Sequence, residues 1–251
     1  MLKLQDINFS INTGNDAVQP ILKKLNMQVK RGEFVVIIGA NGAGKSTLLN
    51  IIAGNLIPDQ GRIILNNKDI NNISAANRSA AIAKVVQDPK VGTMENMTIL
   101  ENLALAALRG KKRGLSLFKQ FRQKQFFKAK LALLNMGLEN RLNDLVINLS
   151  GGQRQALSLI MALVSDSSIL LLDEITAALD PKTAEHIMQI AAKIVRLEQR
   201  STIMITHNMK HALEYGDRTL LLSNGIFSKE FDTAAKKSMT PAILTAEFLD
   251  Y

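Results

Sequence analysis

The sequence predicts an α/β protein, in which helices cover both faces of a parallel sheet. The apolar runs "FVVII" at 34–38, "ILLLD" at 169–173 and "TIMIT" at 202–206 lack the alternation of a half-exposed strand. Strands that are covered on both faces have this uniform pattern. Helical patterns alternate with the later runs, and a glycine-rich loop at 39–47 separates the first run from a helix-like stretch. These observations together indicate strands and helices in alternation.

Strand-like stretches follow one another along the chain at 1–9, 20–29, 34–38, 62–65, 82–86, 168–173, 202–206 and 218–223. The first stretch alternates apolar and polar residues, so it is interpreted as a strand rather than an export signal. The stretch 88–165 is helix-like throughout and predicts a helical insertion. We therefore predict a single domain over 1–251 with two lobes, a core lobe of 1–87 and 166–251 and a helical subdomain of 88–165.

The composition is that of a folded globular protein, with 47% hydrophobic and 21% charged residues. No apolar run approaches the roughly 20 residues that a membrane-spanning helix needs, so a cytosolic protein is the default expectation. The absence of cysteine excludes disulfides and cysteine-ligated zinc but does not identify the compartment.

The net charge of +9 comes from one segment. Nine basic residues and no acidic residue lie in 109–130, and the rest of the chain has equal numbers of each: the nine are Arg109, Lys111, Lys112, Arg113, Lys119, Arg122, Lys124, Lys128 and Lys130. Two interpretations remain open. The segment is either the solvated face of a helix or a contact with anionic headgroups or an acidic partner.

The loop "GANGAGKST" fits the pattern G-x-x-x-x-G-K-[ST] and lies between an apolar strand and a helix, where its mechanism needs it. Glycines allow backbone N–H groups to converge on phosphates at a helix N-terminus. We expect Lys45 to reach the β- and γ-phosphates of a nucleotide and the Ser46 hydroxyl to bind Mg²⁺. The predicted cofactor-binding residues are Gly39, Ala40, Asn41, Gly42, Ala43, Gly44, Lys45, Ser46 and Thr47.

Two carboxylates close the apolar run "ILLLDE". An acidic residue after a strand is often only a helix cap, but together with a phosphate loop it predicts a metal site. Asp173 is expected to hold Mg²⁺ through water. Glu174 is expected to polarise the attacking water as a general base.

A second glycine pair, in "LSGGQ" at 149–153, begins another helix-like stretch. Ser150, Gly151, Gly152 and Gln153 provide a hydroxyl, bare amides and a positive helix end, although a serine-capped glycine turn would look similar. One nucleotide is not expected to be gripped by both loops of the same subunit. We therefore predict a head-to-tail dimer, in which each nucleotide lies between the phosphate loop of one chain and the second loop of the other.

In this order and spacing the residues resemble the ATP-binding cassette (ABC) ATPases over nearly the whole chain. The resemblance implies a P-loop NTPase of the ABC fold, with a RecA-like mixed sheet core, an antiparallel β portion and an inserted helical subdomain. It also implies ATP and Mg²⁺ as cofactors. By this resemblance Gln87 in "VVQDP" senses the metal and the membrane partner, Asp180 in "AALD" couples the two sites, and His207 in "TIMITHN" acts near the γ-phosphate.

Taken singly, each of these three residues also fits a plainer role: Gln87 as a loop residue, Asp180 as a helix cap and His207 as a cap after a strand. His207 and His211 lie four apart on an expected helix, but "HNMKH" lacks the glutamate of a zinc-protease motif, so no zinc is expected. His186 is expected to be solvated.

The sequence departs from the family at two positions. Ile175 stands where many members have proline, with little effect expected. Ile11 in "NFSIN" stands where an aromatic residue usually stacks on adenine, so the base contact is in doubt.

The resemblance further implies the ATPase subunit of a transporter at the cytoplasmic face of the cell membrane. Its expected partners are a second copy of the chain, separate membrane permease subunits and, indirectly, an extracytoplasmic substrate-binding protein. The alternative is a soluble ABC-type ATPase of nucleic acid or translation. Such relatives usually have a coiled-coil insertion, tandem cassettes or cysteine zinc modules, and the sequence has none, so no nucleic-acid partner is expected.

Three longer stretches resemble the ATPases of a particular group of bacterial importers. They are "RGKKRGL" at 109–115, "LSGGQRQALSLIMAL" at 149–163 and "DEITAALDPKTAEHIM" at 173–188. Importers of this group use a lipoprotein-type binding protein and are linked to aromatic amino acids such as tryptophan and tyrosine. Amino-acid import is therefore the expected transport function.

Overall fold

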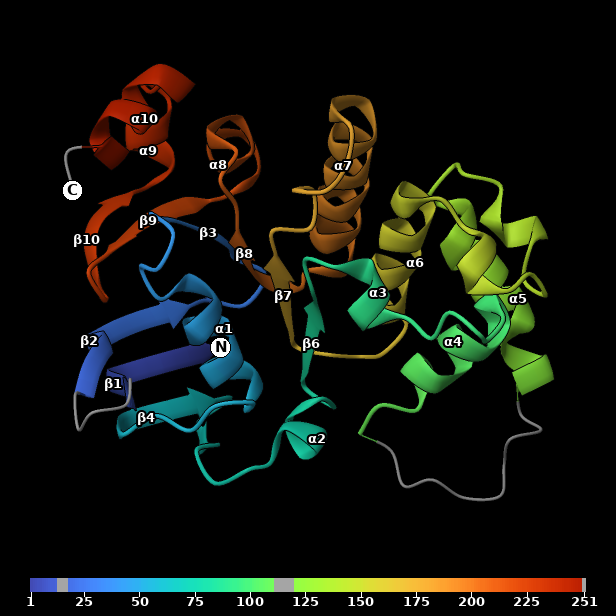
Figure 1. Ribbon diagram of the computed structural model, residues 1–251, viewed down its shortest axis with the longest axis horizontal. Helices are drawn as coiled ribbons and strands as arrows, with labels where there is room; N and C mark the ends of the chain where they lie inside the picture. Colours follow the sequence, from blue (N-terminus) through green and yellow to red (C-terminus); the bar gives the residue numbers. More distant parts are fainter. Residues whose placement is uncertain (13–17, 111–119, 250–251) are drawn as a thin grey trace. The chain divides into compact units, whose positions relative to one another are not determined.

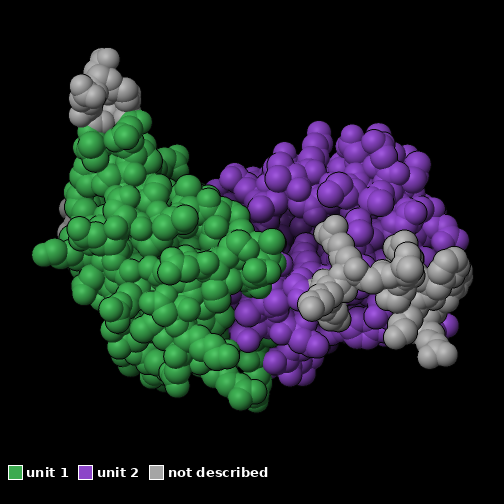
Figure 2. Space-filling model, turned by 90° about the horizontal axis from the view of Figure 1, so that it is seen from below, with its two compact units in different colours: residues 1–78, 199–251 green, residues 79–198 purple. Residues whose placement is uncertain are grey.

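The computed structural model describes residues 1–12, 18–110 and 120–249. The chain divides into two compact units, one of residues 1–78 and 199–251 and the other of 79–198 (Figure 2). The division differs from the predicted lobes, because two strands and a long helix that the sequence assigns to the core lobe belong with the helices of the second unit. The lobe assignment itself stays a prediction.

An antiparallel sheet forms one part of the first unit, with the strand order β2-β1-β4-β5 (Figure 1). Its strands are β1 (Leu2–Asn12), β2 (Val18–Val29), β4 (Gln60–Leu65) and β5 (Lys68–Asp69). Leu2, Leu4 and Ile7 of β1 are buried. This sheet confirms the predicted antiparallel portion.

A second group of strands in this unit has the order β10-β9-β3-β8. These strands are β3 (Phe34–Ile38), β8 (Ser201–Ile205), β9 (Arg218–Ser223) and β10 (Ile226–Phe231). Strand β3 is parallel to both β8 and β9, whereas β10 is antiparallel to β9. Every residue of β3 and β8 is buried, as the uniformly apolar runs predicted.

The helices of the first unit are α1 (Lys45–Ala53), α2 (Ala75–Arg78), α8 (Met209–Tyr215), α9 (Thr233–Lys236) and α10 (Pro241–Leu249). The guanidinium of Arg78 donates hydrogen bonds to the carbonyl oxygens of Ile51 and Ile52, at 2.8 and 3.0 Å. A cation at this end of α1 satisfies carbonyls that have no partner within the helix and complements the helix dipole.

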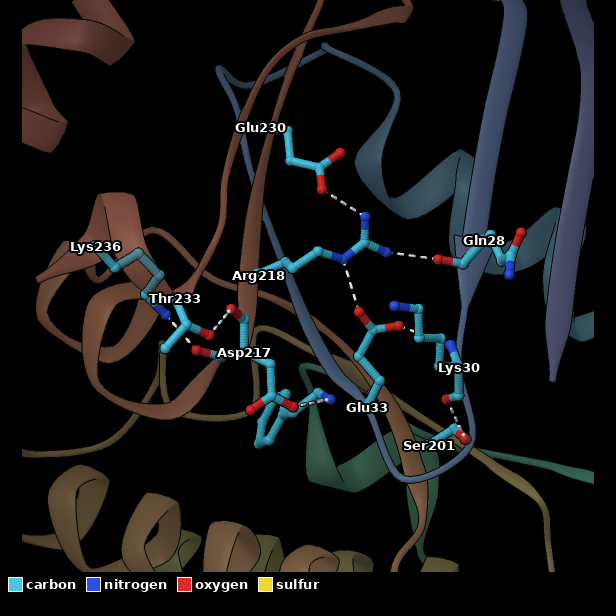
Figure 3. A network of polar contacts seen from close by, with 11 residues as sticks. Gln28, Lys30, Glu33, Ser201, Asp217, Arg218, Glu230, Thr233 and Lys236 are labelled. Carbon is cyan, nitrogen blue, oxygen red and sulfur yellow. Dashed lines mark hydrogen bonds and ion pairs between the residues drawn. The ribbon is translucent and has the colours of Figure 1, made fainter.

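Polar contacts around Arg218 tie the start of β9 to the end of β2 and the turn before β3 (Figure 3). Arg218 Nε donates to Glu33 Oε1 and Nη1 donates to Glu230 Oε1, each at 2.7 Å, while Nη2 donates to the Gln28 carbonyl at 2.6 Å. Asp217 Oδ2 accepts a hydrogen bond from the Phe34 amide at 2.8 Å. These contacts fix the start of β3, the strand that leads into the phosphate loop.

The second unit contains a parallel strand pair and a further set of helices. The strands are β6 (Ile82–Val85) and β7 (Ile169–Asp173). The helices are α3 (Pro89–Gly92), α4 (Ile99–Ala107), α5 (Gln120–Ala132), α6 (Gly151–Leu163) and α7 (Pro181–Glu198), with 3-10 turns at Leu138–Asn140 and Val146–Asn148.

The prediction that 88–165 is helical throughout is wrong in detail. Thr98 caps α4 in a capping box with Glu101, and residues 95–97 before it form a turn and a bend rather than helix. Helix α5 ends at Ala132, and Gly137, with a left-handed φ of 73°, stands directly before the 3-10 turn that follows. Within the described residues, no helix is both long and apolar enough to cross a membrane.

Candidate nucleotide-binding site

The phosphate loop connects β3 to α1 in the first unit. Gly42 and Gly44 have φ angles of 82° and 100°, which side chains other than glycine rarely adopt. Gly44 stands directly before the first helical residue, Lys45, and no side chain caps the helix there. The first turn of α1 therefore presents its backbone and the positive end of its dipole to the loop, an arrangement that suits phosphate.

Two close approaches hold this loop against neighbouring strands. A Cβ atom on Gly39 would lie 2.3 Å from the Leu222 carbonyl oxygen of β9. A Cβ atom on Gly44 would lie 2.8 Å from Leu22 Cδ2 and 3.2 Å from the Ile21 carbonyl oxygen, both in β2. Packing thus requires glycine at both positions, and at Gly44 the backbone conformation requires it as well.

The charged end of Lys45 lies inside the loop. Its Nζ donates to the carbonyl oxygens of Gly39 at 2.7 Å and Ala40 at 2.9 Å, and the residue is only 5% exposed. These hydrogen bonds place the ammonium where the loop converges. Ser46 follows in the first turn of α1 and is exposed.

His207 lies in the same unit, in the bend between β8 and α8, and is exposed. The expectation that His207 and His211 share a helix is wrong, because α8 begins at Met209. The Asn208 side chain accepts a hydrogen bond from the His211 amide at 3.1 Å and so sets the helix start after His207. His211 is buried, with its ring 5.7 Å from that of Tyr215.

In the second unit, β7 ends at Asp173 as the sequence predicted, and Glu174 follows in a turn. Glu174 has a φ of 48°, a left-handed conformation that is uncommon for a residue other than glycine. Such strained positions are often found at functional sites. Ile175, one of the departures from the family pattern, is 3% exposed and belongs to the core.

The sequence analysis missed one partner of this carboxylate pair. Lys84 Nζ lies 3.0 Å from Asp173 Oδ2. The only signal in the sequence was a lysine within the apolar stretch "IAKVV". A charge in such a strand needs a partner, but the sequence does not show which acidic residue provides it.

Gln87 lies in a bend shortly after β6 and is exposed. The next residue, Asp88, caps α3 by accepting a hydrogen bond from the Lys90 amide at 2.8 Å. The glutamine therefore stands at a strand-to-helix junction, as its interpretation requires.

The second glycine loop begins α6. Ser150 Oγ accepts from the Gln153 amide at 3.3 Å, while Gln153 Oε1 accepts from the Ser150 amide at 3.2 Å, which together form a capping box. Gly152 packs closely on α7, because a Cβ atom there would lie 2.6 Å from Thr183 Cγ2. Gly151 faces open space, with nothing within 4 Å of such an atom.

The structure brings this loop together with Asp180. Both line a pocket of about 400 Å³ within the second unit, to which Met136 and Thr183 also contribute. Asp180 Oδ1 accepts a hydrogen bond from the Thr183 amide at 3.0 Å, and hydrogen bonds from Thr183 lower the pKa of the Asp180 carboxyl. Asp180 is thus a helix cap and a pocket residue at once.

The predicted residues fall into two groups. The phosphate loop and His207 belong to the first unit, whereas Gln87, Ser150, Asp173, Glu174 and Asp180 belong to the second. Their roles toward nucleotide and metal stay predictions.

Two described residues of the basic segment already have partners within the chain, Arg109 and Lys130. Lys111, Lys112, Arg113 and Lys119 lie outside the described residues. Arg109 donates to the Met161 carbonyl at 3.4 Å, and burial lowers the pKa of its guanidinium. Lys130 forms an ion pair with Glu198.

His186 is not simply solvated, which corrects the expectation from the sequence. It is half-buried, and its Nε2 lies 2.8 Å from the Leu134 carbonyl oxygen, because α7 packs this face on the chain that follows α5.

The chain has close relatives among known proteins. The family model described as ABC transporter matches residues 22–177. The tyrosine transport ATP-binding protein of Clostridioides difficile is 41% identical over 99% of this chain and 98% of its own length. The phosphonates import ATP-binding protein PhnC of Alcaligenes faecalis is 34% identical over 90% of this chain and 80% of its own.

A solved structure, the dimeric post-hydrolysis state of the ATP-binding cassette MJ0796 bound to ADP and Pi, matches with a TM-score of 0.80 and 30% identity. The match covers 92% of this chain and 98% of that one. The agreement in sequence and fold confirms the ABC fold class. The chain therefore belongs to the ABC transporter family, as an ATP-binding cassette that hydrolyses ATP to drive transport.

Proposed function

We propose that this chain is the ATPase subunit of an importer for an aromatic amino acid. The observation that carries this proposal is the 41% identity with a tyrosine transport ATP-binding protein over nearly the full length of both chains. The sequence stretches around the second glycine loop and from Asp173 onward, which lie within this alignment, resemble the same group of importers.

In this proposal, residues of the first unit bind the nucleotide. Backbone amides of the phosphate loop and the Lys45 ammonium bind the phosphates. The loop carbonyls that hold Lys45 Nζ at 2.7 and 2.9 Å keep its charge in place beforehand. Less rearrangement is then needed when the phosphates enter.

The donors available for a metal fit Mg²⁺. Ser46 offers a hydroxyl and Asp173 a carboxylate, and hard oxygen donors are what Mg²⁺ prefers. None of the described side chains forms a group of three or more His, Cys, Asp or Glu that would hold a metal alone. This agrees with the usual Mg²⁺ site of a nucleotidase, where phosphate oxygens complete the shell. Bound Mg²⁺ would neutralise charge on the phosphates.

Catalysis is assigned to Glu174 and His207. Glu174 follows Asp173 in a sharply turned conformation and accepts the proton of the attacking water. His207, exposed in the bend after β8, is proposed to act near the γ-phosphate. Gln87 couples this chemistry to the membrane partner.

Two copies of the chain are proposed to close head to tail. The pocket that Ser150, Gly151 and Asp180 line would receive the nucleotide bound by the phosphate loop of the second copy. Dimerisation in the presence of nucleotide is reported for the relative MJ0796. The dimer would dock beneath separate permease subunits at the cytoplasmic face of the membrane, and an extracytoplasmic binding protein would supply the substrate.

Transport in a defined system tests the substrate. The chain would be reconstituted in proteoliposomes with the permease and binding protein encoded beside it, and uptake of labelled tyrosine and tryptophan would be followed with ATP. We expect ATP-dependent uptake of at least one of them, and none with the Glu174→Gln variant. Uptake of only a non-aromatic solute would contradict the assigned substrate, while co-purification with DNA or ribosomes instead of a permease would contradict transport.

Mixed dimers test the head-to-tail arrangement. A Lys45→Ala chain paired with a Gly151→Asp chain contains one doubly damaged site and one site with both halves intact. We expect one nucleotide per mixed dimer, measured by equilibrium binding. No bound nucleotide, with dimers still present, would contradict the arrangement.

A further inference from the structure

An ion pair links the proposed metal carboxylate to a lysine on the neighbouring strand. Lys84 Nζ and Asp173 Oδ2 are 3.0 Å apart, and their side chains are only 15% and 10% exposed. Both residues belong to the second unit. The pair is therefore a built feature of that unit, in a place that bulk water reaches poorly.

Strand register explains the contact. Strands β6 and β7 are parallel, and Lys84 lies directly opposite Leu171. Residues two apart in a strand point to the same face, so Asp173 lies on the face to which Lys84 points, one diagonal step away. The lysine reaches the carboxylate at the carboxyl end of β7, where the proposed Mg²⁺ chemistry takes place.

A poorly exposed carboxylate needs a compensating positive charge, because an unpaired buried charge is costly. Lys84 provides that charge from the protein itself. A magnesium ion or its bound water needs the same carboxylate. Whichever oxygen the metal uses, an ammonium beside it repels a doubly charged cation.

We propose that Lys84 is a positioning residue that holds Asp173 in place and sets the Mg²⁺ requirement of the ATPase. The inference rests on the proposed role of Asp173 as the metal carboxylate. The ion pair holds the carboxylate in one orientation before the metal arrives, and the lysine weakens metal binding by its charge. The cassette consequently needs more Mg²⁺ than it would with an uncharged side chain at position 84.

Magnesium titration of nucleotide binding tests the proposal without turnover. The full chain would be titrated with Mg²⁺ at a fixed concentration of a non-hydrolysable ATP analogue. In Lys84→Met we expect the half-saturating Mg²⁺ concentration to fall at least about tenfold, because Coulomb's law gives this size for a single and a double charge about 6 Å apart even in a water-like dielectric, and more where water reaches poorly. Lys84→Arg keeps the charge and should stay close to wild type.

Lys130→Met is the matched control, because it removes another partly exposed lysine from an ion pair in the same unit, with Glu198. Its Mg²⁺ requirement should not change. An unchanged or higher requirement in Lys84→Met, or an equal shift in Lys130→Met, would overturn the proposal. If Lys84→Met does not fold, Lys84→Gln removes the charge but keeps a hydrogen-bond donor, and it should show the same fall.

Asp173→Asn separates this inference from the proposed function. If Asp173 holds the metal, this variant raises the Mg²⁺ requirement. No change in Asp173→Asn would remove Asp173 from the metal site, and with it the basis for Lys84. A change in Asp173→Asn without one in Lys84→Met and Lys84→Gln would overturn the role of Lys84 alone.

Discussion

Helices α1 and α6 both begin at a glycine-rich loop, but their first backbone amides are capped differently. Before α1 stands Gly44, in a left-handed conformation and with no side-chain cap. Before α6 stands Ser150, which shares a complete capping box with Gln153. The first helix start leaves its backbone amides without a side-chain cap, whereas the second satisfies part of its own first turn.

This difference indicates how each loop is used. The first amide groups of a helix need partners from outside the helix. At α6 the serine and glutamine serve that purpose for the Gln153 and Ser150 amides, so part of the turn is satisfied within a single chain, and we expect the loop to add to binding only when a second copy brings a nucleotide. At α1 no side chain caps the helix, and we propose that a phosphate takes this role, so nucleotide affinity in the isolated chain should depend on this loop.

The largest expected effect is on ATP hydrolysis, and it separates nucleotide binding from catalysis. Glu174→Gln should reduce steady-state hydrolysis by at least about 10² to 10⁴-fold, because an amide does not accept the proton of the attacking water. ATP binding should remain near wild type, since the phosphate loop is unchanged. Phosphate-release kinetics and equilibrium binding would be measured on the same preparation. Normal turnover would remove Glu174 from the role of base.

Gly44→Ala tests whether ATP affinity depends on the uncapped start of α1. The new methyl group would meet Leu22 Cδ2 at 2.8 Å at a φ of 100°, so the loop must shift. At a strain of about 1–3 kcal/mol, we expect ATP affinity to fall roughly ten- to a hundredfold, measured by calorimetry.

Gly137→Ala is the control for Gly44→Ala. Its φ is 73° and its surroundings are open, so Gly137→Ala adds backbone strain in the other unit, outside the phosphate loop. It should lower stability without weakening ATP binding. Equal losses of affinity in both variants would show that the effect is general destabilisation.

The sequence predicted the strands and both helix starts well, because these depend on local patterns. The uniformly apolar runs fixed β3, β7 and β8, and the residues around Lys45 and Gly151 marked the beginnings of α1 and α6. Strand β10 was missed, since "IFSKEF" is half-exposed and weakly patterned, although Asn224 and Gly225 before it form a typical hairpin turn.

Sequence patterns did not predict the contacts between segments that lie far apart in the chain. The Lys84–Asp173 pair depends on the register of two strands that lie far apart in the chain, and periodicity does not specify register between parallel strands. The shared pocket of Ser150 and Asp180 depends on how α6 packs on α7. The start of α8 was misplaced because one hydrogen bond from the Asn208 side chain decides it.

A smaller effect is expected on selectivity for the nucleotide base, which the phosphate loop does not contact in the proposed site. Ile11 in β1 is 42% exposed and pairs with Gln19 of β2. An aromatic side chain would add roughly 1–3 kcal/mol of stacking, whereas isoleucine offers only apolar area. We predict that GTP is hydrolysed within about an order of magnitude of ATP, and that Ile11→Tyr tightens ATP binding about tenfold. Strong ATP preference in wild type, or no gain in Ile11→Tyr when nucleotide is titrated, would contradict this.

The smallest expected effect lies at the self-capped start of α6. Ser150→Ala removes the oxygen that accepts from the Gln153 amide at 3.3 Å, and loss of such a cap costs about 1 kcal/mol of folding free energy. Gly151→Ala, in contrast, meets nothing within 4 Å and should leave stability unchanged or slightly raised, because alanine favours helix more than glycine does. Urea unfolding of both variants measures the difference, and ATP binding by the isolated chain should be unaffected in each, since neither touches the phosphate loop.

If Ser150→Ala instead weakened ATP binding in the monomer, the second loop would contact nucleotide within one chain. The proposed difference between α1, whose start needs a ligand, and α6, whose start is capped by its own side chains, would then be wrong.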